Sequence, residues 1–226
     1  MQEYLGMGGS ILSESLLLIL ELVGTVAFSV SGAMTGLRKN MDLFGVAILG
    51  LTTAVGGGMI RDLILGNTPP VMFRDPVYAM VALCTAVIVF LPAVQRLLDR
   101  IHGLYDVLML WMDSLGLGIF TVVGIQTAYT ALEQPGVFLL LFVGVITGVG
   151  GGLLRDLFAG DTPYIFVKHF YACASLIGAA VCVVLWGLLG QTAAVVLGAS
   201  AVVILRLLAV RFRWSLPRVK FYMDKK

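Results

Sequence analysis

Seven long apolar runs, separated by short polar stretches, dominate the sequence. They cover residues 11–37, 43–65, 76–94, 107–131, 136–158, 170–189 and 192–210. A helix of about 20 mostly apolar residues crosses the roughly 30 Å hydrocarbon core of a bilayer. Each run is close to that length, so the pattern predicts an all-α integral membrane protein with seven transmembrane helices.

The composition supports a lipid environment. Hydrophobic residues make up 59% of the chain and charged residues 12%, whereas soluble domains carry about 25% charged residues. The three cysteines fall inside apolar runs and lack metal-ligand spacing. We therefore expect neither a disulfide framework nor a metal site.

The positions of the basic residues predict how the helices are oriented. They follow the first, third, fifth and seventh runs, as Arg38, Lys39, Arg96, Arg100, Lys168 and a basic tail at 211–226. The opposite side carries Arg74. Because Lys and Arg concentrate in cytoplasmic loops, we expect a cytoplasmic C-terminus, an N-terminus outside and a bacterial or archaeal plasma membrane. The tail sets this topology or binds anionic lipids, and without interleaved aromatic residues it does not indicate nucleic-acid binding.

The chain contains an internal repeat. Residues 56–69 read GGGMIRDLILGNTP and residues 150–163 read GGGLLRDLFAGDTP, with nine of fourteen positions identical. The equivalence also pairs Glu21 with Asp113, Gly24 with Gly116, Phe28 with Phe120, Gly32 with Gly124 and Tyr78 with Tyr171. It defines two three-helix units, at 11–94 and 107–189, followed by a seventh helix at 192–210. Because each unit has an odd number of helices, we expect the second to be inverted in the membrane, as in many transporters.

Each unit carries a glycine triplet in the middle of an apolar run. The triplets are Gly56, Gly57 and Gly58 in the second run, and Gly150, Gly151 and Gly152 in the fifth. Three glycines cost about 3 kcal/mol of helix propensity relative to alanine, so we predict that these two helices are broken there. Breaks at matching places in inverted repeats indicate a site within the membrane. The alternative is that the small residues only let helices pack closely.

Arg61-Asp62 and Arg155-Asp156 follow the triplets and place charges at membrane depth. Such charges mark pathways or paired interiors. Since adjacent residues on a helix do not face each other, we predict that Arg61 pairs with Asp156 and Arg155 with Asp62. The pairs then belong to a gate or form a buried ion-pair lock.

Further polar residues of the same helices are candidates for the same site. Thr53 and Thr147 lie about one turn before the triplets; they line a pathway or hydrogen-bond their own helix backbone. Glu21 and Asp113 occupy equivalent places in the first and fourth helices. They line a vestibule that attracts cations or simply lie near an interface. No nucleophile elbow, metal-binding histidine pair or P-loop accompanies these residues, so enzymatic activity is not expected.

The duplicated GGG-x2-RD-x3-G-x-TP pattern, within a three-plus-three-plus-one helix plan, resembles the prokaryotic branch of the trimeric intracellular cation (TRIC) channels. This family is also catalogued as glycine-transporter-like. The resemblance covers about residues 15 to 210. It implies a homotrimer in which each protomer holds a pore between its second and fifth helices, with the glycine triplets at their kinks and the charged pairs close by.

The same resemblance implies conduction of monovalent cations, chiefly K⁺, with no cofactor and with K⁺, Na⁺ and phospholipid as expected ligands. Animal members carry a Lys-Glu-Val-type triplet in place of one glycine triplet. Both triplets here are glycine, so lysine-dependent lipid binding is not implied.

Three functions are compatible with these features. A passive, K⁺-permeable cation channel uses exposed backbone carbonyls and nearby acids, and it is the function we favour. A secondary transporter for a small zwitterion such as glycine would use the arginines for the carboxylate and the aspartates for the ammonium group. A lipid-binding or structural protein leaves the duplicated glycines unexplained.

Overall fold

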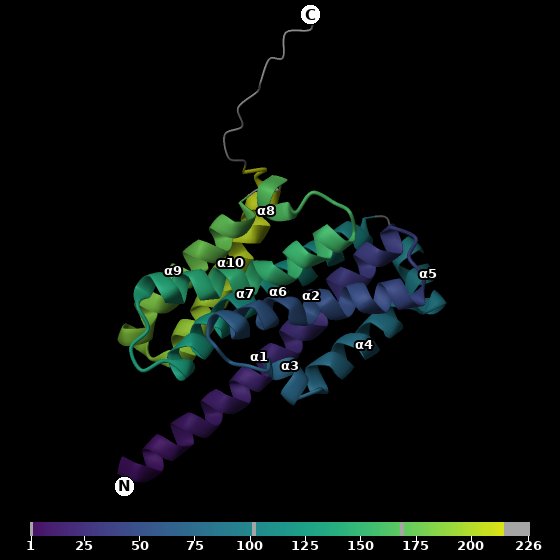
Figure 1. The fold of residues 1–226 in the computed structure, drawn as a ribbon. Coiled ribbons are helices and arrows are strands. Elements are labelled where there is room, and N and C mark those ends of the chain that lie inside the picture. Colours follow the sequence, from purple (N-terminus) through teal and green to yellow (C-terminus); the bar gives the residue numbers. More distant parts are fainter. Residues whose placement is uncertain (1, 101–102, 168–169, 215–226) are drawn as a thin grey trace, which may run out of the picture.

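The computed structural model describes residues 2–100, 103–167 and 170–214, and the regular elements in these ranges are helices. Lys168 and residues 215–226 of the basic tail, both used above to predict the topology, lie outside this part of the chain. The elements of the first unit are α1 (Gln2–Arg38), α2 (Leu43–Ile64), α3 (Val71–Arg74), α4 (Val77–Phe90) and α5 (Pro92–Arg100). Those of the second are α6 (Leu104–Ala131), α7 (Val137–Phe158), α8 (Tyr164–Val167) and α9 (Tyr171–Leu189), and α10 (Gln191–Arg211) follows (Figure 1).

Six helices in this part of the chain are long and apolar enough to cross a membrane, namely α1, α2, α6, α7, α9 and α10. The third predicted span, 76–94, is not one straight helix. Helix α4 ends at Phe90, α5 begins at Pro92, and the two are bent by 66°. Proline lacks the N–H that would continue the helix and drives the preceding residue to an extended conformation, which Leu91 adopts. Counting the bent pair as one span gives the predicted number of seven.

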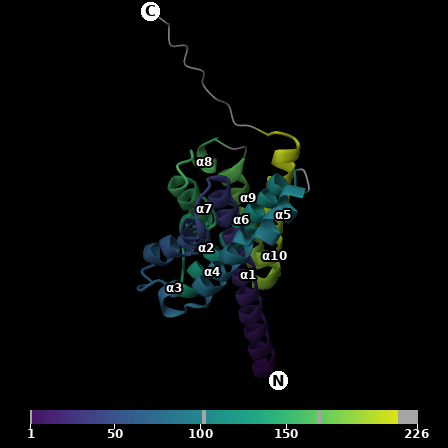
Figure 2. The same cartoon turned by 90° about the vertical axis from the view of Figure 1, so that its right-hand side faces the viewer.

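The two units pack their helices in the same pattern. In the first, α1 contacts α2 and α4, and α2 contacts α4; in the second, α6 contacts α7 and α9, and α7 contacts α9. The units meet through α1 with α6 and α2 with α7, and α10 packs on α9 and α6 (Figures 1 and 2). Helix α10 therefore adds a wall to the second unit that the first unit does not have.

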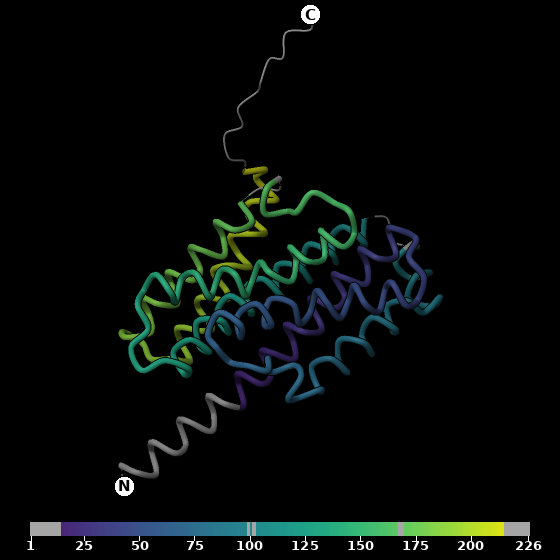
Figure 3. The backbone as a smooth tube through the Cα atoms, viewed as in Figure 1, coloured from purple at the N-terminus to yellow at the C-terminus, as the bar shows by residue number. Residues whose placement is uncertain are grey.

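Both repeat helices end in the same way. The chain leaves α2 at Gly66 and α7 at Gly160, where φ is +74° and +70°. Glycine adopts this left-handed conformation without the strain of a side chain and so ends helices. The chain then turns into α3 and α8 (Figure 3), which lie near the bottom and the top of the bundle in both ribbon views.

Equivalent residues meet where the units join. The rings of Phe28 and Phe120 lie 5.3 Å apart, centroid to centroid. Phe28 packs on Gly116 and Phe120 on Gly24, so tightly that a methyl group on Gly116 would collide with the Phe28 ring. These contacts exchange with each other under the repeat equivalence, as they would about a two-fold axis. The inversion of the units relative to a bilayer stays a prediction.

Candidate functional site

Helices α2 and α7 cross at the glycine triplets. A Cβ atom on Gly57 would collide with the carbonyl oxygen of Thr147, and one on Gly151 would collide with the carbonyl oxygen of Thr53. The two collisions are repeat equivalents of each other. Glycine is therefore required here because the two backbones touch, as in close helix crossings within membranes.

The prediction that these helices are broken at the triplets is wrong. The α-helix runs without interruption from Leu43 to Ile64 and from Val137 to Phe158. Helix propensity alone disfavours three glycines, but in a packed bundle the close crossing compensates for that cost. The packing alternative describes the triplets better.

Thr53 and Thr147 are fully buried beside the crossing. Each hydroxyl donates to the carbonyl oxygen four residues earlier, Leu49 or Val143, at 2.6 Å. Each side chain also packs against the glycine of the neighbouring helix, Gly32 or Gly124. The hydroxyls thus hydrogen-bond the backbone of their own helices, which was one of the two alternatives expected. A pore-lining role for them stays a prediction.

The Arg–Asp pairs are formed within each repeat. Nε of Arg61 donates to Oδ1 of Asp62 at 2.8 Å, and Nη2 forms an ion pair with the same oxygen at 2.8 Å. Arg155 and Asp156 have the same two contacts. The predicted cross-pairing of Arg61 with Asp156 and Arg155 with Asp62 is wrong. Although adjacent Cβ atoms diverge, the long arginine side chain curls back to its neighbour, and no second helix is needed.

The other carboxylate oxygen of each pair holds a short helix. Oδ2 of Asp62 accepts from the backbone N–H of Val71, at 2.9 Å, and Oδ2 of Asp156 accepts from that of Tyr164, at 2.8 Å. These residues are the first of α3 and α8. Each Arg–Asp pair therefore fixes the segment that returns over its own unit.

Asp113 is buried in a charged cluster of the second unit. Its Oδ1 accepts from Nη1 of Arg155 at 2.7 Å, and Nη1 also donates to the Ser31 hydroxyl at 2.5 Å. Nη2 of Arg206 in α10 lies 3.7 Å from Oδ2 of Asp113, and its guanidinium stacks 4.7 Å above the ring of Tyr171. Asp113 is thus ion-paired, and its predicted role as a vestibule acid stays a prediction. Sequence reasoning missed Arg206, although a lone charge inside an apolar run is a signal.

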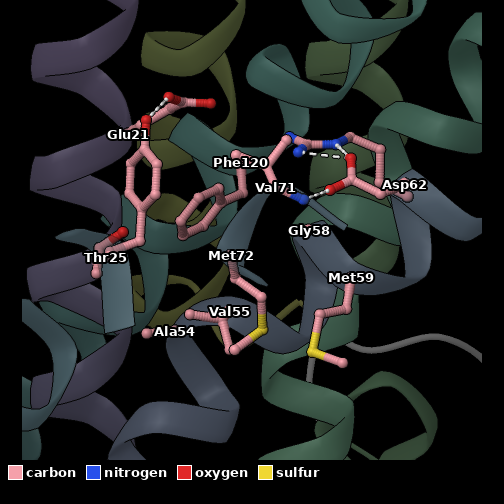
Figure 4. Close-up of a pocket in the computed structure, with 12 residues that line it drawn as sticks. Glu21, Thr25, Ala54, Val55, Gly58, Met59, Asp62, Val71, Met72 and Phe120 are labelled. Carbon is pink, nitrogen blue, oxygen red and sulfur yellow. Dashed lines mark hydrogen bonds and ion pairs between the residues drawn. The ribbon is translucent and has the colours of Figure 1, made fainter. Parts of the chain in front are cut away.

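Glu21 has a different environment from its equivalent, Asp113. Its Oε2 accepts from the Tyr78 hydroxyl at 2.5 Å, and it lines a cavity of about 40 Å³ that we call the first cavity. Figure 4 shows Glu21 on one side of this cavity and Asp62 on the other. The remaining lining residues are Thr25, Ala54, Val55, Gly58, Met59, Arg61, Val71, Met72, Tyr78 and Phe120.

A second cavity, of about 460 Å³, lies beside the charged cluster. It is lined by Asp113, Tyr164 and Arg206 together with Arg38, Asp106, Val107, Met109, Leu110 and Val210. Arg38 follows Glu21 by seventeen residues on α1, which corresponds to about 25 Å along a helix. The two cavities therefore lie toward opposite ends of the buried part of α1. Phe28 lies between Glu21 and Arg38 on α1, and it packs against Gly151 at the crossing and against Phe120, which lines the first cavity.

Two related three-helix units, buried intramembrane charges and a cavity toward each end define a membrane transport protein. The sequence pattern of the Glycine transporter family matches residues 18–93 and 110–187, and the chain belongs to this family. The UPF0126 inner membrane protein YadS of Escherichia coli is 34% identical over 88% of this chain and 93% of its own. A UPF0126 membrane protein of Deinococcus radiodurans is 42% identical over 71% of this chain and 72% of its own.

Solved structures of TRIC channels match this chain. A structure solved to explain conductance through TRIC cation channels is 36% identical, with a TM-score of 0.79 over 91% of this chain and 98% of its own. The TRIC trimeric intracellular cation channel orthologue of Rhodobacter sphaeroides is 34% identical, with a TM-score of 0.80 over 88% of this chain and 99% of its own.

Proposed function

We propose that this protein is a passive channel for monovalent cations, permeable to K⁺, with one pathway in each protomer. The observation that carries the proposal is the pair of cavities separated by the crossing of α2 and α7. The similarity to TRIC cation channels, at 36% identity over nearly the whole chain, supports it independently.

The proposed pathway enters the first cavity past Glu21, passes Phe28 and Phe120 beside the glycine crossing, and leaves through the second cavity past Asp106. The two acids around the first cavity outnumber its one arginine and favour cations over anions, whereas two aspartates and two arginines line the second cavity. In the described structure the rings and the touching backbones close the middle, so conduction requires α2 and α7 to move relative to each other. Arg61 and Arg155 do not repel cations strongly, because each is neutralised by its neighbouring aspartate.

The same proposal includes an assembly and an orientation. Three protomers form a homotrimer in a bacterial plasma membrane, with the two units inverted relative to each other, the N-terminus outside and the C-terminus in the cytoplasm. The trimeric orthologue of Rhodobacter sphaeroides supports the assembly. The basic ends of α1 and α10, at Arg38 and Arg211, support the orientation.

The proposal is tested by K⁺ flux from liposomes that carry the purified protein in their membrane. They contain KCl at about 0.15 M and are diluted into N-methyl-D-glucamine chloride. A channel lets K⁺ leave and makes the interior negative. When a proton carrier is added, protons enter and quench the fluorescence of a pH-sensitive dye, and no K⁺ ionophore such as valinomycin is needed. Protein-free liposomes are the control. Failure to quench, together with saturable counterflow of labelled glycine, contradicts the channel and establishes a transporter.

A further inference from the structure

The two units carry equivalent charged residues, but α10 adds an arginine beside the second unit. The carboxylates of Asp113 and Asp156 in the second unit face the guanidiniums of Arg155 and of Arg206 from α10, which gives a formal charge of zero. In the first unit, Glu21 and Asp62 line the first cavity with Arg61, which gives a formal charge of −1. The difference arises because α10, which supplies Arg206, packs on α6 and α9 of the second unit.

The Arg206 guanidinium shows where a positive charge lies relative to Asp113 and Tyr171. It is 3.7 Å from Oδ2 of Asp113 and 4.7 Å from the centroid of the Tyr171 ring. A cation in this position is stabilised by the carboxylate charge and by the face of the aromatic ring. Tyr171 itself hydrogen-bonds Asp113, at 3.5 Å.

The first unit presents the equivalent carboxylate and ring next to a cavity. Glu21 and Tyr78 are the repeat equivalents of Asp113 and Tyr171, they hydrogen-bond each other at 2.5 Å, and both line the first cavity. The cavity volume of about 40 Å³ exceeds the roughly 10–15 Å³ that one water needs. A cation with one or two waters fits there.

Asp62 and Arg61 do not cancel the charge of Glu21. Both Nε and Nη2 of Arg61 bind Oδ1 of Asp62, and Oδ2 of Asp62 accepts from the backbone of α3. In the second unit, by contrast, Arg155 reaches both aspartates. The first unit thus keeps its guanidinium on the neighbouring aspartate and leaves space beside Glu21.

From these contacts we infer that the first cavity binds one permeating monovalent cation between the Glu21 carboxylate and the Tyr78 ring, in the place that the Arg206 guanidinium takes in the second unit. This inference rests on the proposed function for the identity of the ion, and it adds the site and the residue that give cation preference. Glu21 is then the specificity-determining residue of the pathway.

The first test replaces Glu21→Gln, which removes the charge but keeps an oxygen that accepts from Tyr78. Glu133→Gln is the matched control, because Glu133 is exposed in the loop after α6 and does not line the cavity. We expect Glu21→Gln to lower the single-channel K⁺ conductance about threefold at 0.1 M KCl, the scale for one unit charge several ångströms away in a high dielectric. At 1 M KCl, where the screening length falls to about 3 Å, the loss shrinks.

Equal conductance of Glu21→Gln and Glu133→Gln at 0.1 M KCl overturns the inference, although the wild-type current still supports the channel. Absence of current in the wild type contradicts the proposed function instead. Binding of K⁺ is measured separately, by thermal unfolding. The Tm of the wild type in KCl, compared with N-methyl-D-glucamine chloride of equal ionic strength, should rise by a few degrees, and this rise should vanish in Glu21→Gln and persist in Glu133→Gln.

The converse test removes the built-in cation. Arg206→Gln leaves the second unit with the charge of the first, so K⁺ should replace the guanidinium. We expect the Tm of Arg206→Gln to depend on KCl more steeply than that of the wild type. If Arg206→Gln is destabilised equally in KCl and in N-methyl-D-glucamine chloride, the equivalence between the guanidinium and a bound cation is wrong.

Discussion

Asp113 is a fully buried carboxylate that binds Arg155 and lies beside Arg206. Burying a charge is costly, and removing one partner of a buried pair leaves the other uncompensated. Its equivalent Glu21 is only half-buried and hydrogen-bonds a neutral tyrosine. Both positions therefore adjoin a cavity, but Asp113 is held in ion pairs with arginines whereas Glu21 is not.

Asp113→Asn should destabilise the protein by about 3–5 kcal/mol, the usual loss when a buried ion pair is broken. Glu21→Gln should cost no more than about 1 kcal/mol, because its hydrogen bond to Tyr78 can be kept. Thermal unfolding of the detergent-solubilised protein, followed by size-exclusion chromatography with fluorescence detection, compares the two. Equal losses would show that Asp113 is not more tightly paired than Glu21.

At this scale the sequence identifies the charged residues but not their partners. The duplicated motif indicates Arg61, Asp62, Arg155 and Asp156, and all four are buried. Their pairing depends on side-chain torsion angles, which let an arginine reach the next residue. The role of Arg206 depends on where α10 packs, and a repeat comparison cannot reveal it because α10 has no counterpart.

Helices α2 and α7 touch at Gly57 and Gly151, and not every glycine of the triplets takes part equally. At Gly58, the nearest atom to an added Cβ is a terminal nitrogen of Arg61, 3.7 Å away, which is an ordinary contact. At Gly57 the nearest atom belongs to the backbone of α7, which cannot yield without moving the helix.

Gly57→Ala should therefore destabilise the protein by about 1–3 kcal/mol through overpacking. Gly58→Ala, its matched control one residue away, should be neutral or stabilising by up to about 1 kcal/mol, because alanine favours the helix. The measurement is the Tm of each variant in detergent. A loss of stability in Gly58→Ala as large as in Gly57→Ala would mean that the triplet has a backbone role beyond the crossing.

The apolar pattern predicts the elements well and their interruptions poorly. Six of the seven predicted spans correspond to single helices, because an apolar run of this length has little alternative in a bilayer. The triplets were expected to break helices because propensity was weighed without the partner helix. The bend at Pro92, by contrast, was not predicted for the run at 76–94, although proline disfavours continuation of a helix.

For the whole molecule, the repeat predicts two similar units, and the packing of α1, α2 and α4 matches that of α6, α7 and α9. What differs is the surroundings of the units. In the second, α10 supplies Arg206 beside Asp113 and the second cavity, whereas no arginine from outside the unit lies beside Glu21 in the lining of the first cavity. Such an asymmetry places one acidic and one neutral half in series along the proposed pathway, with the crossing of α2 and α7 between them.

The measurement that tests the central claim most directly is the current through the purified protein in a planar lipid bilayer under a KCl gradient. The account predicts discrete current steps that reverse close to the K⁺ equilibrium potential. A reversal close to the Cl⁻ potential would contradict a cation pathway. A silent bilayer, with the protein shown to be folded and inserted, would contradict a channel altogether.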